Sequence, residues 1–409
     1  MGDPAADAAL DAPALGLGLL APLHAATIVA AVRNRTPARE VICRLTVPPR
    51  IGRTPPCDLL AVLRRGQRHG GRSAPCSRSV TVLLSPAAGL PAACRRWQRM
   101  DDFLIQRTDG PTWEVAPSVI HARQALARAT ADLLGVPDDA LEKPWPWMPG
   151  EEEADVRYGF YRCVESIERA AGSAARSLDE AAIRRSTATR FVAPATNARW
   201  ELHGALKPLR DELLDADPGG GEWTIRQTLG HIVATQRAYA WFTAWWLRRA
   251  EVGDFPKRVP DDVVAASGAP DEAREGEGSL VDIRLRFDDI LDLGAGRLAS
   301  LGDQDLGVRA RWSGLPVTVG FRLGRWSSHI AEHTVQVDKT LAMLGRAPTE
   351  VERLVRLISG AYGRLEAVVF GLPPEVVEGS GAASPAAALR DASQELVATG
   401  ASVRAAAGN

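Results

Sequence analysis

Cysteine is scarce in this chain, with five residues among 409. Cys43, Cys57, Cys76 and Cys94 lie in the first hundred residues at spacings of fourteen, nineteen and eighteen, so the C-x-x-C pairs of a zinc ribbon are missing. The fifth, Cys163, is expected to be a small buried hydrophobic residue. Because no disulfide framework is apparent, we expect a reducing compartment and therefore a cytoplasmic location.

The sequence also lacks a long uninterrupted apolar run. Residues 12–32 carry no acidic or basic side chain, but Pro, Gly and His24 interrupt this stretch. Asp3, Asp7 and Asp11 precede it, where a signal peptide needs positive charge. We therefore expect no membrane segment.

Lysine is absent from residues 1–100, which carry fourteen Arg and five acidic residues, a net charge of about +9. Residues 101–409 carry thirty-five basic and forty-five acidic residues, about −10, so the overall charge of −1 combines two compositions. The early Arg residues are mixed with Pro, Gly and Cys and show no amphipathic period, which is typical of disorder rather than of a nucleic-acid-binding arm. Residues 1–100 are predicted to be disordered, or to precede a true start at Met100, and we expect no nucleic-acid partner.

From residue 101 onward, apolar side chains recur at helical spacing and predict an all-α protein. The expected segments are an N-terminal helical extension (101–194, helices 119–134 and 155–178), a four-helix segment (195–346, helices 198–215, 224–250, 280–301 and 319–344) and C-terminal helices (347–409, helices 349–370 and 385–406). Residues 180–194 are expected to be a linker, and residues 251–278 a long polar connection. Thr224 and Gln227 predict a capping box, and R-W-S-G-L-P-V-T predicts a short hairpin.

Three histidines form a candidate metal site. His329 and His333 lie four residues apart in W-S-S-H-I-A-E-H-T-V-Q, which places their β-carbons about 6 Å apart on one helix face. On the earlier helix, arginines recurring every eleven residues mark the solvated side, and His231 lies about 140° away, facing inward. Three imidazoles with a fourth position left open are typical of a reactive site for Zn²⁺ or Ni²⁺. A histidine pair at this spacing also arises by chance, so the hypothesis depends on convergence of all three.

Two polar neighbours accompany the histidine pair. Glu332 falls on the solvated side of the helix, whereas Gln336 follows His333 by one turn and is the better candidate to hydrogen-bond to it. The letters from His329 to His333 also spell H-x-x-E-H, the inverted zinc-protease signature, in which Glu332 would activate water and a distant Glu would be the third ligand. Both interpretations remain open from the sequence.

The segments G-E-W-T-I-R-Q-T-L-G-H (221–231) and R-W-S-S-H-I-A-E-H-T-V-Q-V-D-K (325–339) resemble the DinB-like superfamily over residues 197–344. The resemblance implies an up-down four-helix bundle of the DinB-like type with extra flanking helices. It also implies a divalent metal ion bound by His231, His329 and His333. Characterised relatives include thiol-dependent transferases and mycothiol-dependent maleylpyruvate isomerases. The latter typically carry Glu where this chain has His329, so the isomerase reaction is not assigned.

The function expected from this resemblance is activation of a low-molecular-weight thiol, with mycothiol preferred, or of water, for transfer to an electrophilic small molecule. The alternatives are a metal-dependent hydrolase and a non-catalytic module that binds a metal or a small molecule. The expected partners are thus the thiol and the electrophile, and homodimerisation through a bundle face is compatible with such a domain.

Overall fold

The computed structural model describes residues 114–148, 150, 154–379 and 384–408. The predictions for residues 1–100, including a start at Met100, lie outside these residues. None of the described helices combines the length and the apolar character needed to cross a bilayer.

The all-α prediction is confirmed, since the described residues are mainly helical and the one sheet among them has two strands. The longer helices are α3 (Pro117–Leu134), α4 (Val156–Glu180), α6 (Pro194–Leu206), α7 (Ile225–Val252), α10 (Leu280–Leu298), α12 (Val319–Met343), α13 (Glu350–Val369) and α15 (Pro385–Gly408). The short elements are η1 (Asp138–Ala140), α5 (Thr187–Val192), η2 (Asp211–Leu213), α8 (Asp261–Ala266), α9 (Glu272–Glu275), α11 (Asp303–Leu306), β1 (Arg309–Trp312), β2 (Leu315–Thr318) and α14 (Pro374–Glu378).

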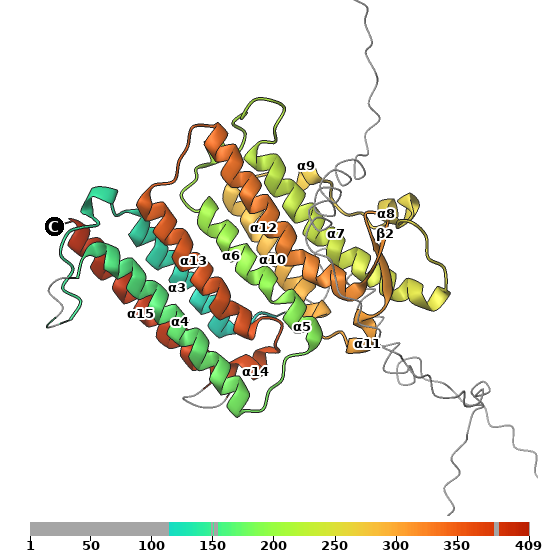
Figure 1. The fold of residues 1–409 in the computed structure, drawn as a ribbon, viewed down its shortest axis with the longest axis horizontal. Coiled ribbons are helices and arrows are strands. Elements are labelled where there is room, and N and C mark those ends of the chain that lie inside the picture. The colour runs from blue at the N-terminus through green and yellow to red at the C-terminus, as the bar shows by residue number, and fades with distance from the viewer. Residues whose placement is uncertain (1–113, 149, 151–153, 380–383, 409) are drawn as a thin grey trace, which may run out of the picture. The chain divides into compact units, whose positions relative to one another are not determined.

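Four helices from the central segment pack together around one apolar core. Helix α6 contacts α12, α12 contacts α7, α7 contacts α10, and α10 returns to α6 (Figure 1). Trp326 and Leu323 of α12 and Leu291 of α10 are fully buried in this core. The apolar stripes of these helices therefore face one another, as the helical period of the sequence indicates.

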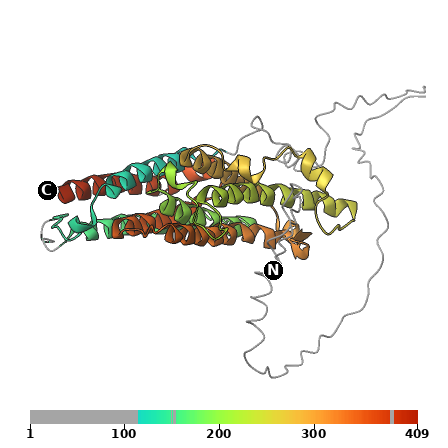
Figure 2. The same ribbon diagram turned by 90° about the horizontal axis from the view of Figure 1, so that it is seen from above.

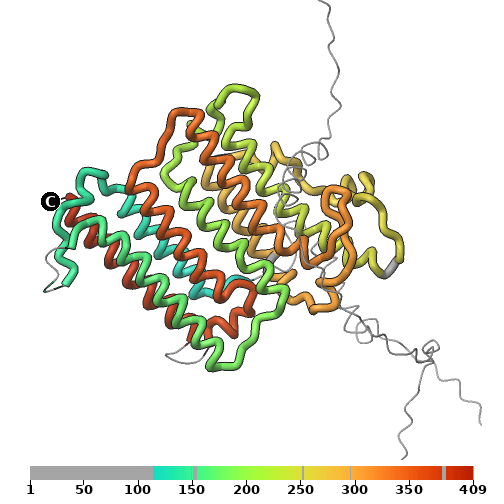
Figure 3. The backbone as a smooth tube through the Cα atoms, viewed as in Figure 1, coloured from blue at the N-terminus to red at the C-terminus, as the bar shows by residue number. Residues whose placement is uncertain are grey.

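The flanking helices form a second packed layer rather than separate appendages. Helices α3 and α4 both contact α13 and α15 (Figure 2). The side chains between these helices form a core that includes Phe160 and Cys163. Cys163 is fully buried, as predicted, and burial raises the pKa of its thiol to about 12. Helix α13 also packs along α6, which joins the two cores (Figure 3).

A buried cluster of charges lies where the two cores meet. Arg199 of α6 and Arg123 of α3 both bind the carboxylates of Asp292 (α10) and Glu366 (α13). Arg199 is fully buried, and Glu366 is 1% exposed. Since each buried charge has an opposite partner, the cluster satisfies the condition for burying ions.

Several helix ends follow from local sequence. The capping box at Thr224 and Gln227 is present at the start of α7. Helix α6 ends at Leu206, however, so the prediction of a helix as far as residue 215 was wrong. Pro208 explains the difference, because proline donates no backbone hydrogen bond and its ring clashes with the carbonyl one turn earlier, although Lys207 before it still has helical backbone angles.

Two connections differ from a plain loop. Residues 180–194, expected to be a linker, contain α5, which Ser186 caps by accepting from the backbone N–H of Thr189. The connection 251–278 contains α8 and α9. The hairpin predicted from R-W-S-G-L-P-V-T is present as β1 and β2, which pair antiparallel before α12.

Candidate metal centre

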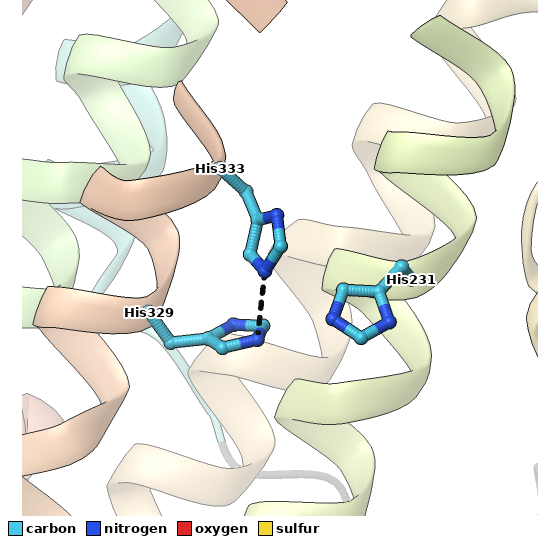
Figure 4. A group of neighbouring side chains, drawn as sticks. All are labelled: His231, His329 and His333. Carbon is cyan, nitrogen blue, oxygen red and sulfur yellow. Dashed lines mark hydrogen bonds between the residues drawn. The ribbon is translucent and has the colours of Figure 1, made fainter. Parts of the chain in front are cut away.

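The three predicted histidines come together between α7 and α12. His231 projects from α7, and His329 and His333 project from α12 toward it (Figure 4). The ring centroid of His231 lies 5.2 Å from that of His329 and 4.6 Å from that of His333. The centroids of His329 and His333 are 4.4 Å apart. One ligand atom from each residue lies within 4.8 Å of the other two. Helices far apart in sequence thus place three imidazoles at one point.

The Nδ1 atom of each ring already has a neighbour. Nδ1 of His231 lies 2.8 Å from Oε1 of Glu272, and Nδ1 of His333 lies 2.7 Å from Oε1 of Gln336. Nδ1 of His329 lies 3.4 Å from the side-chain amide of Gln236. Because an Nδ1–H held by an acceptor leaves its lone pair on Nε2, the contacts with Glu272 and Gln336 favour Nε2 as the ligand atom of His231 and His333.

The distance between two of these atoms fits a shared ion. Nε2 of His329 and Nε2 of His333 are 3.1 Å apart (Figure 4). Two ligands of a tetrahedral zinc ion with bonds of about 2.0–2.1 Å are separated by about 3.3 Å. The donor set is therefore suited, in spacing and in chemistry, to a borderline divalent ion such as Zn²⁺ or Ni²⁺.

The amide of Gln236 supports the same assignment. As placed, Nε2 of Gln236 faces His329, and its Oε1 is buried without a partner. A half-turn of the amide would bring Oε1 against Nδ1–H of His329 and satisfy both groups. That exchange is required when Nε2 of His329 serves as a ligand, because Nδ1 then carries the proton.

No motif in the sequence points to Glu272, which lies in α9 within the connection 251–278. Gly230, directly before His231, makes this contact possible. A β-carbon at Gly230 would lie 2.3 Å from the backbone oxygen of Glu272, so only glycine lets α9 lie this close to α7. A glycine inside a continuous helix, directly before an inward histidine, indicates that another segment packs closely there. Gly230 is therefore the sequence feature that points to a neighbour such as Glu272.

Arginines of α7 hold α9 in place. Arg226 donates from Nη1 to the carbonyls of Gly276 and Gly278, each at 2.7 Å. About three turns further along α7, Arg237 donates to Glu275 at 2.6 Å. The Glu275 side chain is 1% exposed. Arg226 and Arg237, which were expected on the solvated side of α7, are only 27% and 30% exposed because they anchor the segment that carries Glu272.

Burial keeps the α12 pair uncharged. Desolvation, followed by the neighbouring His333 and His231, lowers the pKa of His329 to about 2. The pKa of His333 is also lowered, first by desolvation and then by His231. Neutral imidazole is the form that binds metals, so both rings are ready to act as ligands at neutral pH.

Comparison with known protein families adds one finding to this geometry. Residues 194–337 match the model of the DinB superfamily. This segment is a DinB-superfamily domain. It covers about a third of the chain and includes α6, α7, α10 and most of α12, which carry all three histidines. No curated protein and no solved structure gave a match to the chain.

Glu332 does not face the DinB-domain histidines. Its carboxylate accepts from Nη1 and Nη2 of Arg325 at 2.8 and 2.6 Å, and its side chain is 57% exposed. The third group beside the His329 and His333 pair is His231 rather than a glutamate. This arrangement departs from the inverted zinc-protease pattern, in which the glutamate between the histidines activates water.

The other described histidines lie elsewhere. His203 of α6 is buried, with Nε2 2.7 Å from Asp288 and with Nδ1 accepting from Nε of Arg284 at 3.0 Å. Both of its ring nitrogens are therefore engaged within the bundle. His121 lies on the exposed side of α3. Neither residue joins the group formed by His231, His329 and His333.

Proposed function

We propose that His231, His329 and His333 bind one divalent ion, Zn²⁺ or Ni²⁺, and that the DinB domain is a metal-dependent enzyme. The proposed reaction transfers a low-molecular-weight thiol, or water, to an electrophilic small molecule in the cytoplasm. The supporting observation is that one ligand atom from each of the three histidines lies within 4.8 Å of the other two, while each Nδ1 has its own neighbour. Three protein ligands leave a fourth position for a reactant, as catalytic rather than structural zinc sites do.

An ion bound there would lower the pKa of a coordinated thiol or water enough to supply thiolate or hydroxide at neutral pH. The residues of the chain have supporting tasks. Glu272 orients the ring of His231 and increases the basicity of its ligand nitrogen. Gln336 orients the ring of His333. His329 is only 6% exposed, so one side of the site is closed to water, whereas His231 and His333 are half-buried. A reactant would therefore approach from the side of His231 and His333.

Metal analysis of the purified protein tests the site. We expect about one Zn²⁺ or Ni²⁺ per chain in the wild type and loss of the metal in His231→Ala, His329→Ala and His333→Ala. Retention of the metal in His231→Ala would instead support a hydrolase whose third ligand is a distant glutamate. Circular dichroism of each variant shows whether the helices persist.

An activity assay separates the enzyme from a non-catalytic binding module. The metal-loaded protein is incubated with mycothiol, the first thiol to test, and a chlorodinitrobenzene-type acceptor. We expect conjugation faster than background, with loss of this excess rate in His333→Ala. If the loaded protein shows only the background rate with mycothiol and with other small thiols, the transferase proposal fails and the binding module remains.

A further inference from the structure

Arg322 is a buried cation near the first turn of α12. Arg322 is only 3% exposed. Nε donates to Oγ1 of Thr243 at 3.1 Å, and Nη1 donates to the carbonyl of Arg311 in β1 at 2.8 Å. Nη2 is buried and has no hydrogen-bond partner. Arginine presents a planar fork of donors, so the free Nη2 is an open position for an acceptor.

Arg322 has no carboxylate partner within the part of the chain that the structure describes. Its neighbours therefore offset little of the free-energy cost of burying its charge. The buried Arg199, by contrast, binds both Asp292 and Glu366. An unpaired buried charge is costly. The N-terminal end of a helix, where Arg322 lies, favours negative charge and adds to that cost. Contacts with the rings of Tyr239 and Phe242, at 5.7 and 5.9 Å, offset only part of it.

Tyr239 links this cation to the histidine site. Its ring centroid lies 5.5 Å from that of His329. Arg322 and His329 are seven residues apart, about two helical turns, and so share one face of α12. The Cα atoms of the two residues are therefore separated by about 10 Å along the helix axis. The contact between Arg322 and Thr243 of α7 places the guanidinium in the same interface between α7 and α12 as the histidines.

The phenol of Tyr239 has a donor to spare. Its oxygen accepts from Nε1 of Trp312 at 3.3 Å, which leaves the phenolic hydrogen for an acceptor. Trp312 belongs to the β1–β2 hairpin, which also supplies the Arg311 carbonyl bound by Arg322. The hairpin thus makes one hydrogen bond with Tyr239 and one with Arg322 at this end of the interface.

We propose that Nη2 of Arg322, assisted by the hydroxyl of Tyr239, binds a carboxylate group on a reactant of the histidine site. The substrate would then be an anionic small molecule, and this catalytic role of Arg322 rests on the proposed function. Carboxylate binding itself does not, because the guanidinium belongs to the protein with or without a metal. A carboxylate would supply the opposite charge that the other deeply buried arginine, Arg199, receives from the protein itself.

The main experiment compares thiols that differ only in charge. Protein loaded with Co²⁺ is titrated with mercaptopropionate and mercaptohexanoate, and with the matched alcohols mercaptopropanol and mercaptohexanol. The sulfur-to-cobalt charge-transfer band reports binding. We expect the wild type to bind at least one acid about tenfold more tightly than its alcohol, which corresponds to about 1.4 kcal/mol. In Arg322→Gln the preference should fall to parity, and Arg322→Lys should retain part of it.

Arg325→Gln is the matched control. Arg325 lies one turn further along α12, and its guanidinium pairs with the exposed carboxylate of Glu332, so its removal should leave the preference for acids intact. Equal affinity of the wild type for acids and alcohols at both chain lengths would overturn the inference. So would loss of the preference in Arg325→Gln together with its retention in Arg322→Gln. The melting temperature of each variant identifies one that fails to fold, in which case the Arg322→Lys result decides.

A second measurement keeps this inference distinct from the proposed function. Metal-free protein is titrated with glutarate by calorimetry, for the wild type and Arg322→Gln. If no thiol produces a cobalt band, the thiol-transfer proposal fails. Glutarate binding that depends on Arg322 would still support the carboxylate site, and absence of such binding would overturn it.

Discussion

Nδ1 of His231 and Oε1 of Glu272 lie 2.8 Å apart, although 41 residues separate them in the sequence. A carboxylate that accepts the second ring proton of a histidine fixes the tautomer and raises the basicity of the ligand nitrogen. The short helix α9 therefore contributes to the candidate metal centre without supplying a ligand. Its placement depends on the glycine before His231 and on the arginines of α7.

Replacement of Glu272 by Gln or Ala should weaken metal binding. We expect the affinity for Zn²⁺ to fall roughly 10- to 100-fold, because the His231 ring loses its anionic hydrogen-bond partner. Competition with a chromophoric chelator measures the change. Glu332→Gln is the control, since Glu332 faces solvent, and it should leave the affinity unchanged. Wild-type affinity in Glu272→Ala would show that α9 has no part in the site.

Gly230→Ala should displace α9. The added methyl group would lie 2.3 Å from the backbone oxygen of Glu272, and a backbone atom cannot yield as a flexible side chain can. We expect a lower melting temperature and weaker Zn²⁺ binding, the latter in the direction of Glu272→Ala. Gly172→Ala in α4 meets nothing within 4 Å and should be neutral or stabilising by up to about 1 kcal/mol. Equal behaviour of the two variants would contradict the close-packing argument.

The buried cluster between the two cores should be sensitive to loss of one partner. Arg199→Met leaves Glu366 and Asp292 with Arg123 alone, and we expect the free energy of unfolding to fall by about 3 kcal/mol. Urea denaturation measures this loss. Arg364→Met provides the comparison, because Arg364 pairs with Glu168 at the surface and its removal should cost less than about 1 kcal/mol. Similar losses in both variants would argue against a special role for the cluster.

Acid should destabilise the protein through Glu366. Burial by itself would raise the pKa of this carboxyl, but Arg123 and Arg199 lower it well below its ordinary value of 4.5. A group whose pKa is depressed on folding stabilises the folded state above its unfolded pKa. That stabilisation is lost as the pH falls below about 4.5 and through the depressed folded pKa. We therefore expect the free energy of unfolding to decline over this acidic range.

The variant Glu366→Gln isolates the contribution of this carboxyl. It should be less stable than the wild type at neutral pH and should show a flatter decline below about pH 4.5. Urea unfolding at a series of pH values provides the curves. Glu168→Gln, which removes a surface carboxyl, controls for the change in net charge. An unchanged slope in Glu366→Gln would mean that other carboxyls govern the acid response.

Local signals predicted most of the helices within a few residues. The capping box at Thr224 and Gln227 and the hairpin before α12 are short-range features, and each is present. The error at the end of α6 came from following apolar periodicity past Pro208. Residues 180–194 were expected to be a linker because they are polar, yet the cap at Ser186 and the buried Val192 form α5 there.

The sequence by itself determined the helical class, the inward direction of His231 and the pairing of His329 with His333, because helical periodicity places each side chain on a known face of its own helix. Only the tertiary structure decided that the flanking helices build a second core, that Glu272 reaches His231 and that Arg322 is buried without a carboxylate among the described residues. These features depend on which faces of distant segments meet, and periodicity within one helix carries no information about its partner.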